Sequence, residues 1–184
     1  EKMNHAYAES SRLSKNNPTP FYNHIVGSHY DPLKSAEEIL TLCKNWQETF
    51  KPGNNVRRAV AKNKAKNKKL RIGMISDGLR SHPVGNMITL GLSHIPASQM
   101  EFYAYSTNFS EDHITHRIQR ICTKWQVVAS LTDDVLDKLI REVEIDILFD
   151  LCGYNANSRM HALQAAPAPL IIKWVGGLIS STGL

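Results

Sequence analysis

From residue 70 onward, short apolar runs alternate with amphipathic stretches, and this alternation constrains the fold more than any other feature of the chain. The apolar runs predict strands over 70–75, 102–105, 125–128, 145–151 and 170–175. The stretches between them predict helices over 84–95, 111–122, 133–143 and 157–165. A strictly alternating order implies right-handed crossovers and a parallel sheet with helices on both faces. We therefore predict a Rossmann-like α/β domain over residues 70–184, with strand order 3-2-1-4-5.

Residues 1–50 have a different pattern, that of a small helical lead-in. Ser35 and Glu38 form a capping box ahead of apolar residues at helical spacing, and Pro52-Gly53 is a stop signal. An earlier helix should end before Asp31-Pro32, because the residue before a proline disfavours helical conformation. Further N-caps are expected at Ser110, Thr132 and either Asn157 or Ser158.

The net charge of +5 comes from one segment. Residues 51–71 hold nine of the 22 Lys and Arg and no acidic residue, whereas acidic residues outnumber basic ones in the rest of the chain. We interpret residues 51–69 as a solvated basic connector, because charge runs are usually solvated. A phosphate or RNA patch is the less favoured alternative, since no aromatic residue is interleaved on which a base could stack.

Cysteine usage and hydropathy exclude several classes of protein. Cys43, Cys122 and Cys152 are odd in number, far apart and never in a CxxC pair, which argues against a disulfide framework and a zinc site. His113 and His116 lie three apart on a predicted helix without a carboxylate pattern, so we expect a solvated surface and no metal. No apolar run approaches the ~20 residues of a membrane span, and the start has no signal-peptide pattern. We expect a soluble, cytoplasmic protein.

Three loops should meet at one edge of the predicted sheet. The first, fourth and fifth strands are neighbours, and they are followed by SDGLRSHPVGN, CGYNANSR and GGLISSTG. Open α/β sheets bind ligands at the carboxyl ends of their strands, so these loops form the candidate site. Asp77 and Arg80 are either ligand contacts or turn formers, and Arg159 either contacts a ligand or pairs with a nearby carboxylate.

His82 is the most informative residue of this edge. It precedes Pro83, which suits the first turn of a helix, so the imidazole should lie near a helix N-terminus that favours its neutral form. A neutral imidazole can accept a proton. The alternative is a histidine that hydrogen-bonds the backbone and holds the turn. The loop has no GxGxxG, and the chain has neither a P-loop nor a GxSxG elbow, which disfavours dinucleotide, P-loop and α/β-hydrolase chemistry.

Three motifs in order, with the segment NHIVGSHYDP before them, resemble the O-GlcNAc transferase family, including SPINDLY-type proteins. The motifs are His-Pro in LRIGMISDGLRSHPVGNMI, Gly-Tyr in IDILFDLCGYNANSR, and Ala-Pro-Ala-Pro followed by Trp-x-Gly in APAPLIIKWVGG. The resemblance covers residues 21–184. It implies the amino-terminal lobe of a two-lobed GT-B glycosyltransferase, preceded by the end of a tetratricopeptide region.

The resemblance also implies an activity, transfer of a sugar from a nucleotide sugar, UDP-GlcNAc, to protein Ser or Thr, with no metal or other cofactor. His82 matches the family's active-site histidine. The acidic residue that the family has four positions earlier is replaced by Gly78, and Asp77, one position before it, is the catalytic candidate that would substitute for it if the turn shifts. The implied substrate-binding residues are Gly78, Arg80, Pro83, Gly153, Tyr154, Asn155, Arg159 and Gly176.

In GT-B enzymes the carboxyl-terminal lobe holds most of the nucleotide sugar, and this sequence contains no such lobe. We therefore expect this chain alone to be inactive and to bind the donor weakly. The sequence also departs from the family after Trp174-Val175-Gly176, where relatives continue Tyr-Pro-Gly-Thr. The alternative function is a non-catalytic protein-interaction module derived from the same family, with a protein or peptide partner.

Overall fold

A computed structural model describes residues 2–14, 16–51, 59–61, 68–96 and 98–176. Its first part is a helical unit of α1 (Lys2–Leu13), α2 (Thr19–Ser28) and α3 (Ala36–Thr49). The predicted capping box begins α3: the Ser35 side chain accepts from the Glu38 N–H, and the Glu38 side chain accepts from the Ser35 N–H. The sequence did not predict α1. The stop signal Pro52-Gly53 lies outside the described residues.

The second part is a five-stranded sheet, all parallel, with the order β3-β2-β1-β4-β5. Its strands are β1 (Leu70–Ser76), β2 (Met100–Ser106), β3 (Lys124–Val127), β4 (Ile147–Asp150) and β5 (Leu170–Lys173). The predicted strand order is confirmed. The fourth and fifth strands are shorter than predicted, because the chain turns at Leu151 and Trp174 to form the loops of the carboxyl edge.

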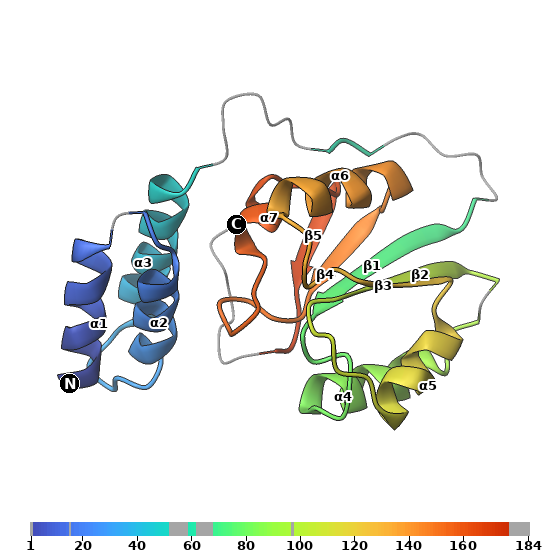
Figure 1. The fold of residues 1–184 in the computed structure, drawn as a ribbon, viewed down its shortest axis with the longest axis horizontal. Coiled ribbons are helices and arrows are strands. Elements are labelled where there is room, and N and C mark those ends of the chain that lie inside the picture. Colours follow the sequence, from blue (N-terminus) through green and yellow to red (C-terminus); the bar gives the residue numbers. More distant parts are fainter. Residues whose placement is uncertain (1, 15, 52–58, 62–67, 97, 177–184) are drawn as a thin grey trace.

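Helices cover both faces of the sheet (Figure 1). The helices are α4 (Pro83–Leu92), α5 (His113–Ile121), α6 (Asp133–Val143) and α7 (Met160–Gln164). The pair α4 and α5 lies on one face, and the pair α6 and α7 on the other. This division follows from the strand order, since right-handed crossovers place a helix on opposite faces when the chain moves toward opposite edges.

Each face of β1 contributes to a different core, as the alternation of strand side chains requires. Ile72 and Met74 pack with α4 and α5, whereas Ile75 packs with α6 and α7. Gly73 faces the same side as Ile75, where a Cβ would lie 2.8 Å from Leu148 Cδ1. The α6 and α7 side therefore packs too tightly for a side chain at residue 73.

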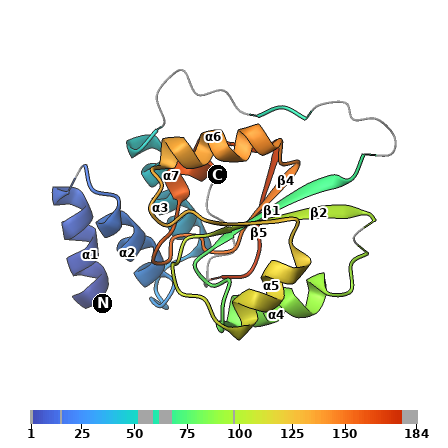
Figure 2. The ribbon, with the colours of Figure 1, turned by 45° about the vertical axis from the view of Figure 1, so that its right-hand side comes forward.

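The helical unit packs against the loops at the carboxyl edge of the sheet (Figure 2). Trp46 is fully buried and contacts the rings of Tyr22, Tyr154 and His161 in tilted or edge-to-face arrangements, at centroid distances of 5.6, 5.5 and 5.3 Å. Gln164 Nε2 also donates to the Gln47 carbonyl at 2.7 Å. The two parts consequently share one hydrophobic core.

Two predicted helix starts were wrong. The N-cap of α5 is Asp112, not Ser110, because the Asp112 carboxylate accepts from the N–H groups of Ile114 and Thr115. The N-cap of α7 is Arg159, not Asn157 or Ser158, and no side chain caps that helix. The predicted Thr132 cap of α6 is confirmed.

Most of the basic connector lies outside the described residues. Within its described portion, the Ala59 N–H donates to the Ala166 carbonyl at 2.9 Å, which attaches residues 59–61 to the loop before β5. None of the described helices is both long and apolar enough to cross a bilayer.

Candidate functional site

The carboxyl ends of β1, β4 and β5 are linked directly. The Leu151 N–H donates to the Ile75 carbonyl at 3.1 Å, and the Ser76 hydroxyl donates to the Leu151 carbonyl at 3.4 Å. The Trp174 N–H donates to the Asp150 carbonyl at 3.0 Å. The three loops that the sequence singled out therefore begin side by side at one edge.

His82 is the N-cap of α4. The side-chain Nδ1 of His82 accepts from the Val84 backbone N–H at 3.3 Å. The backbone N–H of His82 donates to the Arg80 carbonyl at 2.7 Å. The side chain is partly exposed. The alternative, that this histidine hydrogen-bonds the backbone and holds the turn, therefore applies to its Nδ1 atom.

The cap determines what the neutral imidazole can do. Because the Nδ1 lone pair accepts from Val84, the proton of the neutral ring is at Nε2. The ring nitrogen left for a ligand is therefore a hydrogen-bond donor. Acceptance of a proton at Nδ1 would require the cap to open.

The remaining predicted residues of this loop mostly shape the turn. The Arg80 Nε donates to the Asp77 carbonyl at 3.2 Å, which favours the turn-forming role for both residues. Pro83 occupies the first turn of α4, as predicted. At Gly78 a Cβ would lie 2.6 Å from His82 Nδ1, so the imidazole occupies the space that a side chain at residue 78 would need.

Sequence reasoning missed two residues that hold this loop from α5. Asp112 Oδ2 accepts from the Ser81 N–H at 2.6 Å, and Thr115 Oγ1 donates to the Leu79 carbonyl at 3.0 Å. The hydrogen bond from Ser81 is the largest of several that hold the pKa of Asp112 below its ordinary value. An acidic residue directly before a helical pattern was the available signal, but Ser110 was preferred as the cap.

The turn after β4 is organised around Asp150, which sequence reasoning also missed. This carboxylate is 2% exposed and accepts from the N–H groups of Cys152 and Gly153, both at 2.9 Å. Gly153 has a φ of 62°, which favours glycine. Asn155 Nδ2 donates to the Cys152 carbonyl at 2.9 Å. The predicted ligand contacts Gly153 and Asn155 thus belong to a closed turn.

Tyr154 is a core residue rather than an exposed side chain of the edge. Its side chain is 2% exposed, packs between Tyr22 and Trp46, and is hydrogen-bonded to Cys43. Burial raises the pKa of its hydroxyl. The helical unit encloses the ring of Tyr154, so in this structure the side chain packs in the core, and its predicted contact with substrate stays a prediction.

Arg159 is held by hydrogen bonds to the protein and lines a cavity with Thr107 and Asn157. Its Nε donates to Asp133 Oδ1 at 2.6 Å, and its two terminal nitrogens donate to the Val128 and Leu131 carbonyls at 2.8 and 2.7 Å. The alternative of a carboxylate partner is therefore correct, and a ligand contact of Arg159 stays a prediction. The guanidinium ties the start of α7 to the loop before α6.

Gly176 lies against the end of β4, in agreement with its predicted place at this edge. It has a φ of 64°, and a Cβ would lie 1.6 Å from the Leu151 carbonyl oxygen. Lys173, which was not predicted, donates from Nζ to the carbonyls of Gly176, at 2.8 Å, and Val175. Burial lowers the pKa of Lys173, although Asp150 opposes this effect.

The described residues contain no group of three His, Cys, Asp or Glu side chains that could hold a metal ion. His116 is exposed on α5, and its Nε2 lies 3.9 Å from Oε2 of Glu111, which precedes that helix. All three cysteines are free, and burial raises the pKa of Cys152 to about 12.

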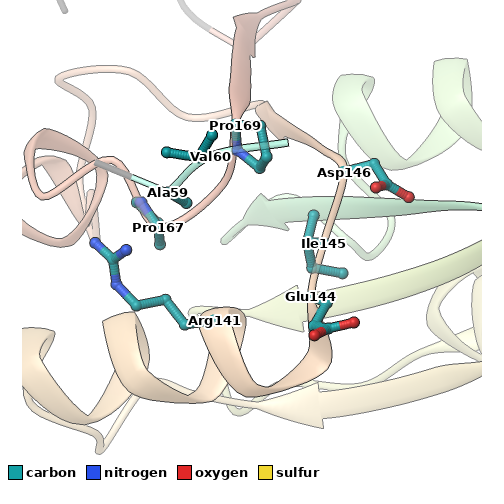
Figure 3. Close-up of a pocket in the computed structure, with 8 residues that line it drawn as sticks. All are labelled: Ala59, Val60, Arg141, Glu144, Ile145, Asp146, Pro167 and Pro169. Atoms are coloured by element: carbon teal, nitrogen blue, oxygen red, sulfur yellow. The ribbon is translucent and has the colours of Figure 1, made fainter. Parts of the chain in front are cut away.

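One cavity lies at the opposite edge of the sheet (Figure 3). It has a volume of about 190 Å³ and is lined by Ala59, Val60, Arg141, Glu144, Ile145, Asp146, Pro167 and Pro169. Asp146 and Pro169 directly precede β4 and β5, so this cavity opens at the amino ends of the strands. It is separate from the loop that carries His82.

Comparisons with known proteins identify relatives by sequence and by fold. No protein-family model matches the chain. Among curated proteins, it is 29% identical over 117 residues to the probable UDP-N-acetylglucosamine–peptide N-acetylglucosaminyltransferase SPINDLY of Arabidopsis thaliana, a match covering 61% of this chain and 13% of the relative. It is 23% identical over 183 residues to the Oryza sativa protein of the same name, covering 97% of this chain and 20% of the relative.

A solved structure extends the likeness to three dimensions. A mutant O-GlcNAc transferase of Thermobaculum terrenum superposes with a TM-score of 0.85 at 26% identity, covering 95% of this chain and 34% of the bacterial chain. This chain therefore spans between 13% and 34% of the length of the proteins it matches here. The predicted fold class, a Rossmann-like amino-terminal lobe of the GT-B kind after a helical segment, is confirmed. In sequence and in fold, the chain is O-GlcNAc-transferase-like.

Proposed function

We propose that this chain is the amino-terminal lobe, with its helical lead-in, of a glycosyltransferase that moves N-acetylglucosamine from UDP-GlcNAc to Ser or Thr of a protein. The observation that carries the proposal is the position of His82. It caps α4 at the edge where the loops after β1, β4 and β5 begin, within a lobe that superposes on an O-GlcNAc transferase. A cytoplasmic location is part of the same proposal.

The chemistry requires an acceptor hydroxyl to be oriented and eventually to lose its proton, while charge builds on the leaving diphosphate. The neutral His82 ring can donate from Nε2 to a substrate oxygen. We therefore assign it the positioning of a donor or acceptor oxygen, with proton acceptance at Nδ1 only after the cap to Val84 opens. Asp77 remains a candidate for a second polar contact.

The diphosphate is proposed to bind mainly outside this lobe. A diphosphate needs free N–H donors or cations around it. At this edge the N–H groups of Gly78, Cys152, Gly153 and Val84 already donate to Ser76, Asp150 and His82. No metal or other cofactor forms part of the proposal.

The test is a pair of substitutions at His82, assayed for transfer in the full-length protein. An asparagine can still accept from the Val84 N–H and keep the cap, but it lacks the Nε2 donor. We expect His82→Asn to lower the transfer rate by about 10²-fold or more, in the range of a group that acts in the reaction. The melting temperature should stay near that of the wild type.

His82→Ala is the matched variant, because it removes the cap as well as the donor. It should show the same loss of transfer together with a stability loss of about 1 kcal/mol. Wild-type turnover in His82→Asn would refute a chemical role. A wild-type protein that binds peptides but transfers no sugar would favour the non-catalytic interaction module.

A further inference from the structure

The loop that presents His82 is attached to α5 at two points. Asp112 Oδ2 accepts from the Ser81 N–H at 2.6 Å, and Thr115 Oγ1 donates to the Leu79 carbonyl at 3.0 Å. The Thr115 side chain is fully buried. The two contacts flank Arg80, so they fix the backbone on both sides of that residue.

The same loop also packs closely against the first turn of α4. A Cβ at Gly85 in the first turn of α4 would lie 2.1 Å from the Arg80 carbonyl oxygen. That same carbonyl accepts from the His82 N–H at 2.7 Å. Arg80 is thus confined between α4 and α5, and His82 follows it by two residues.

Asp112 has two separate tasks, one for each oxygen. Oδ1 accepts from the N–H groups of Ile114 and Thr115 at 2.9 and 3.1 Å and caps α5. Oδ2 accepts from Ser81. An asparagine offers a single acceptor oxygen, so it can cap the helix but cannot also accept from Ser81.

We propose that Asp112 and Thr115 are positioning residues for His82. They hold Leu79, Arg80 and Ser81 so that the imidazole remains at the start of α4 with Nδ1 facing the Val84 N–H. The orientation of the His82 ring, and therefore the placement of its proton on Nε2, then depends on α5, whose Asp112 lies 31 residues after Ser81. The consequence for turnover rests on the function proposed above, whereas the consequence for the ring does not.

The first test is nitrogen-15 NMR of the histidine rings in the 184-residue chain. The wild type should show His82 mainly as the tautomer protonated at Nε2 when the ring is neutral. Asp112→Asn should mix the two tautomers and increase amide exchange of Ser81 by about tenfold, the size expected for loss of a hydrogen bond to a charged group. Asp134→Asn removes a charge from the exposed first turn of α6 and should change neither signal.

Thr115→Val tests the second point of attachment without a change in side-chain shape. It should affect the His82 signals in the same direction as Asp112→Asn. If both variants fold and leave the tautomer and the Ser81 exchange rate unchanged, the proposal is overturned. Loss of the α5 helix signals in Asp112→Asn would also count against it, because the asparagine should preserve the cap.

The second test measures transfer in the full-length protein. Asp112→Asn should lower kcat by about tenfold with little change in the KM for the nucleotide sugar, because the diphosphate is proposed to bind outside this lobe. An unchanged kcat beside a mixed tautomer would overturn the catalytic consequence. If the wild type transfers no sugar, the proposed function fails while the NMR experiment still decides whether Asp112 and Thr115 orient the ring.

Discussion

The loop after β1 and the turn after β4 begin at the same edge of the sheet, but they use their polar groups differently. The loop after β1 is braced from outside, by Asp112 and Thr115 of α5, and His82 remains partly exposed. In the turn after β4, Asp150 closes the backbone on itself, Tyr154 is buried, and the Arg159 guanidinium is paired with Asp133. Two loops rich in glycine and small polar residues thus differ in what is left for a ligand.

The comparison shows that a polar residue near a site becomes a ligand contact only if the fold leaves its hydrogen-bonding atoms free. Buried polar groups must find partners, and a partner inside the protein removes that group from recognition. The three predictions below test this difference, beginning with the largest expected effect.

The largest effect is expected at Arg159. Arg159→Ala removes three hydrogen bonds and leaves the Val128 and Leu131 carbonyls without this partner, so the free energy of unfolding should fall by about 3 kcal/mol. Urea denaturation measures the change. Arg117→Ala, on the exposed side of α5, is the control and should lie within about 0.5 kcal/mol of the wild type. A stable Arg159→Ala variant with weakened substrate binding would show instead that Arg159 contacts a ligand.

An intermediate effect is expected for two glycines on the same helix, α4. Gly85→Ala would place a Cβ 2.1 Å from the Arg80 carbonyl and should lower the free energy of unfolding by about 2 kcal/mol. Gly91→Ala meets no atom within 4 Å and should raise it by about 0.5–1 kcal/mol. Thermal unfolding of both variants checks the pair. Equal effects would show that the His82 loop is not packed tightly on α4.

The smallest effect is expected at Tyr154. Tyr154→Phe keeps the aromatic packing with Tyr22 and Trp46 and removes the hydroxyl that is hydrogen-bonded to Cys43, so the loss of stability should be about 1 kcal/mol or less. Transfer by the full-length variant should equal that of the wild type. A selective rise in KM at unchanged stability would contradict the packing role of this residue.

Local sequence patterns determined much of the fold. The alternation of apolar runs and amphipathic stretches after residue 70 was enough for the parallel sheet and its strand order. The capping box at Ser35 and the N-cap at Thr132 were also predictable, because their partners lie within three residues along the chain. His82 at the start of α4 belongs to the same class, since His-Pro is a local signal.

The tertiary structure alone decided which edge residues remain available. Asp112 reaches Ser81 across 31 residues and Arg159 reaches Asp133 across 26, distances over which no periodicity in the sequence operates. Tyr154 became a core residue because α2 and α3, more than 100 residues earlier, supply Tyr22 and Trp46. The sequence by itself determined the order of strands and helices through local preferences, while partners brought together by folding determined whether each polar side chain faces a ligand or the protein.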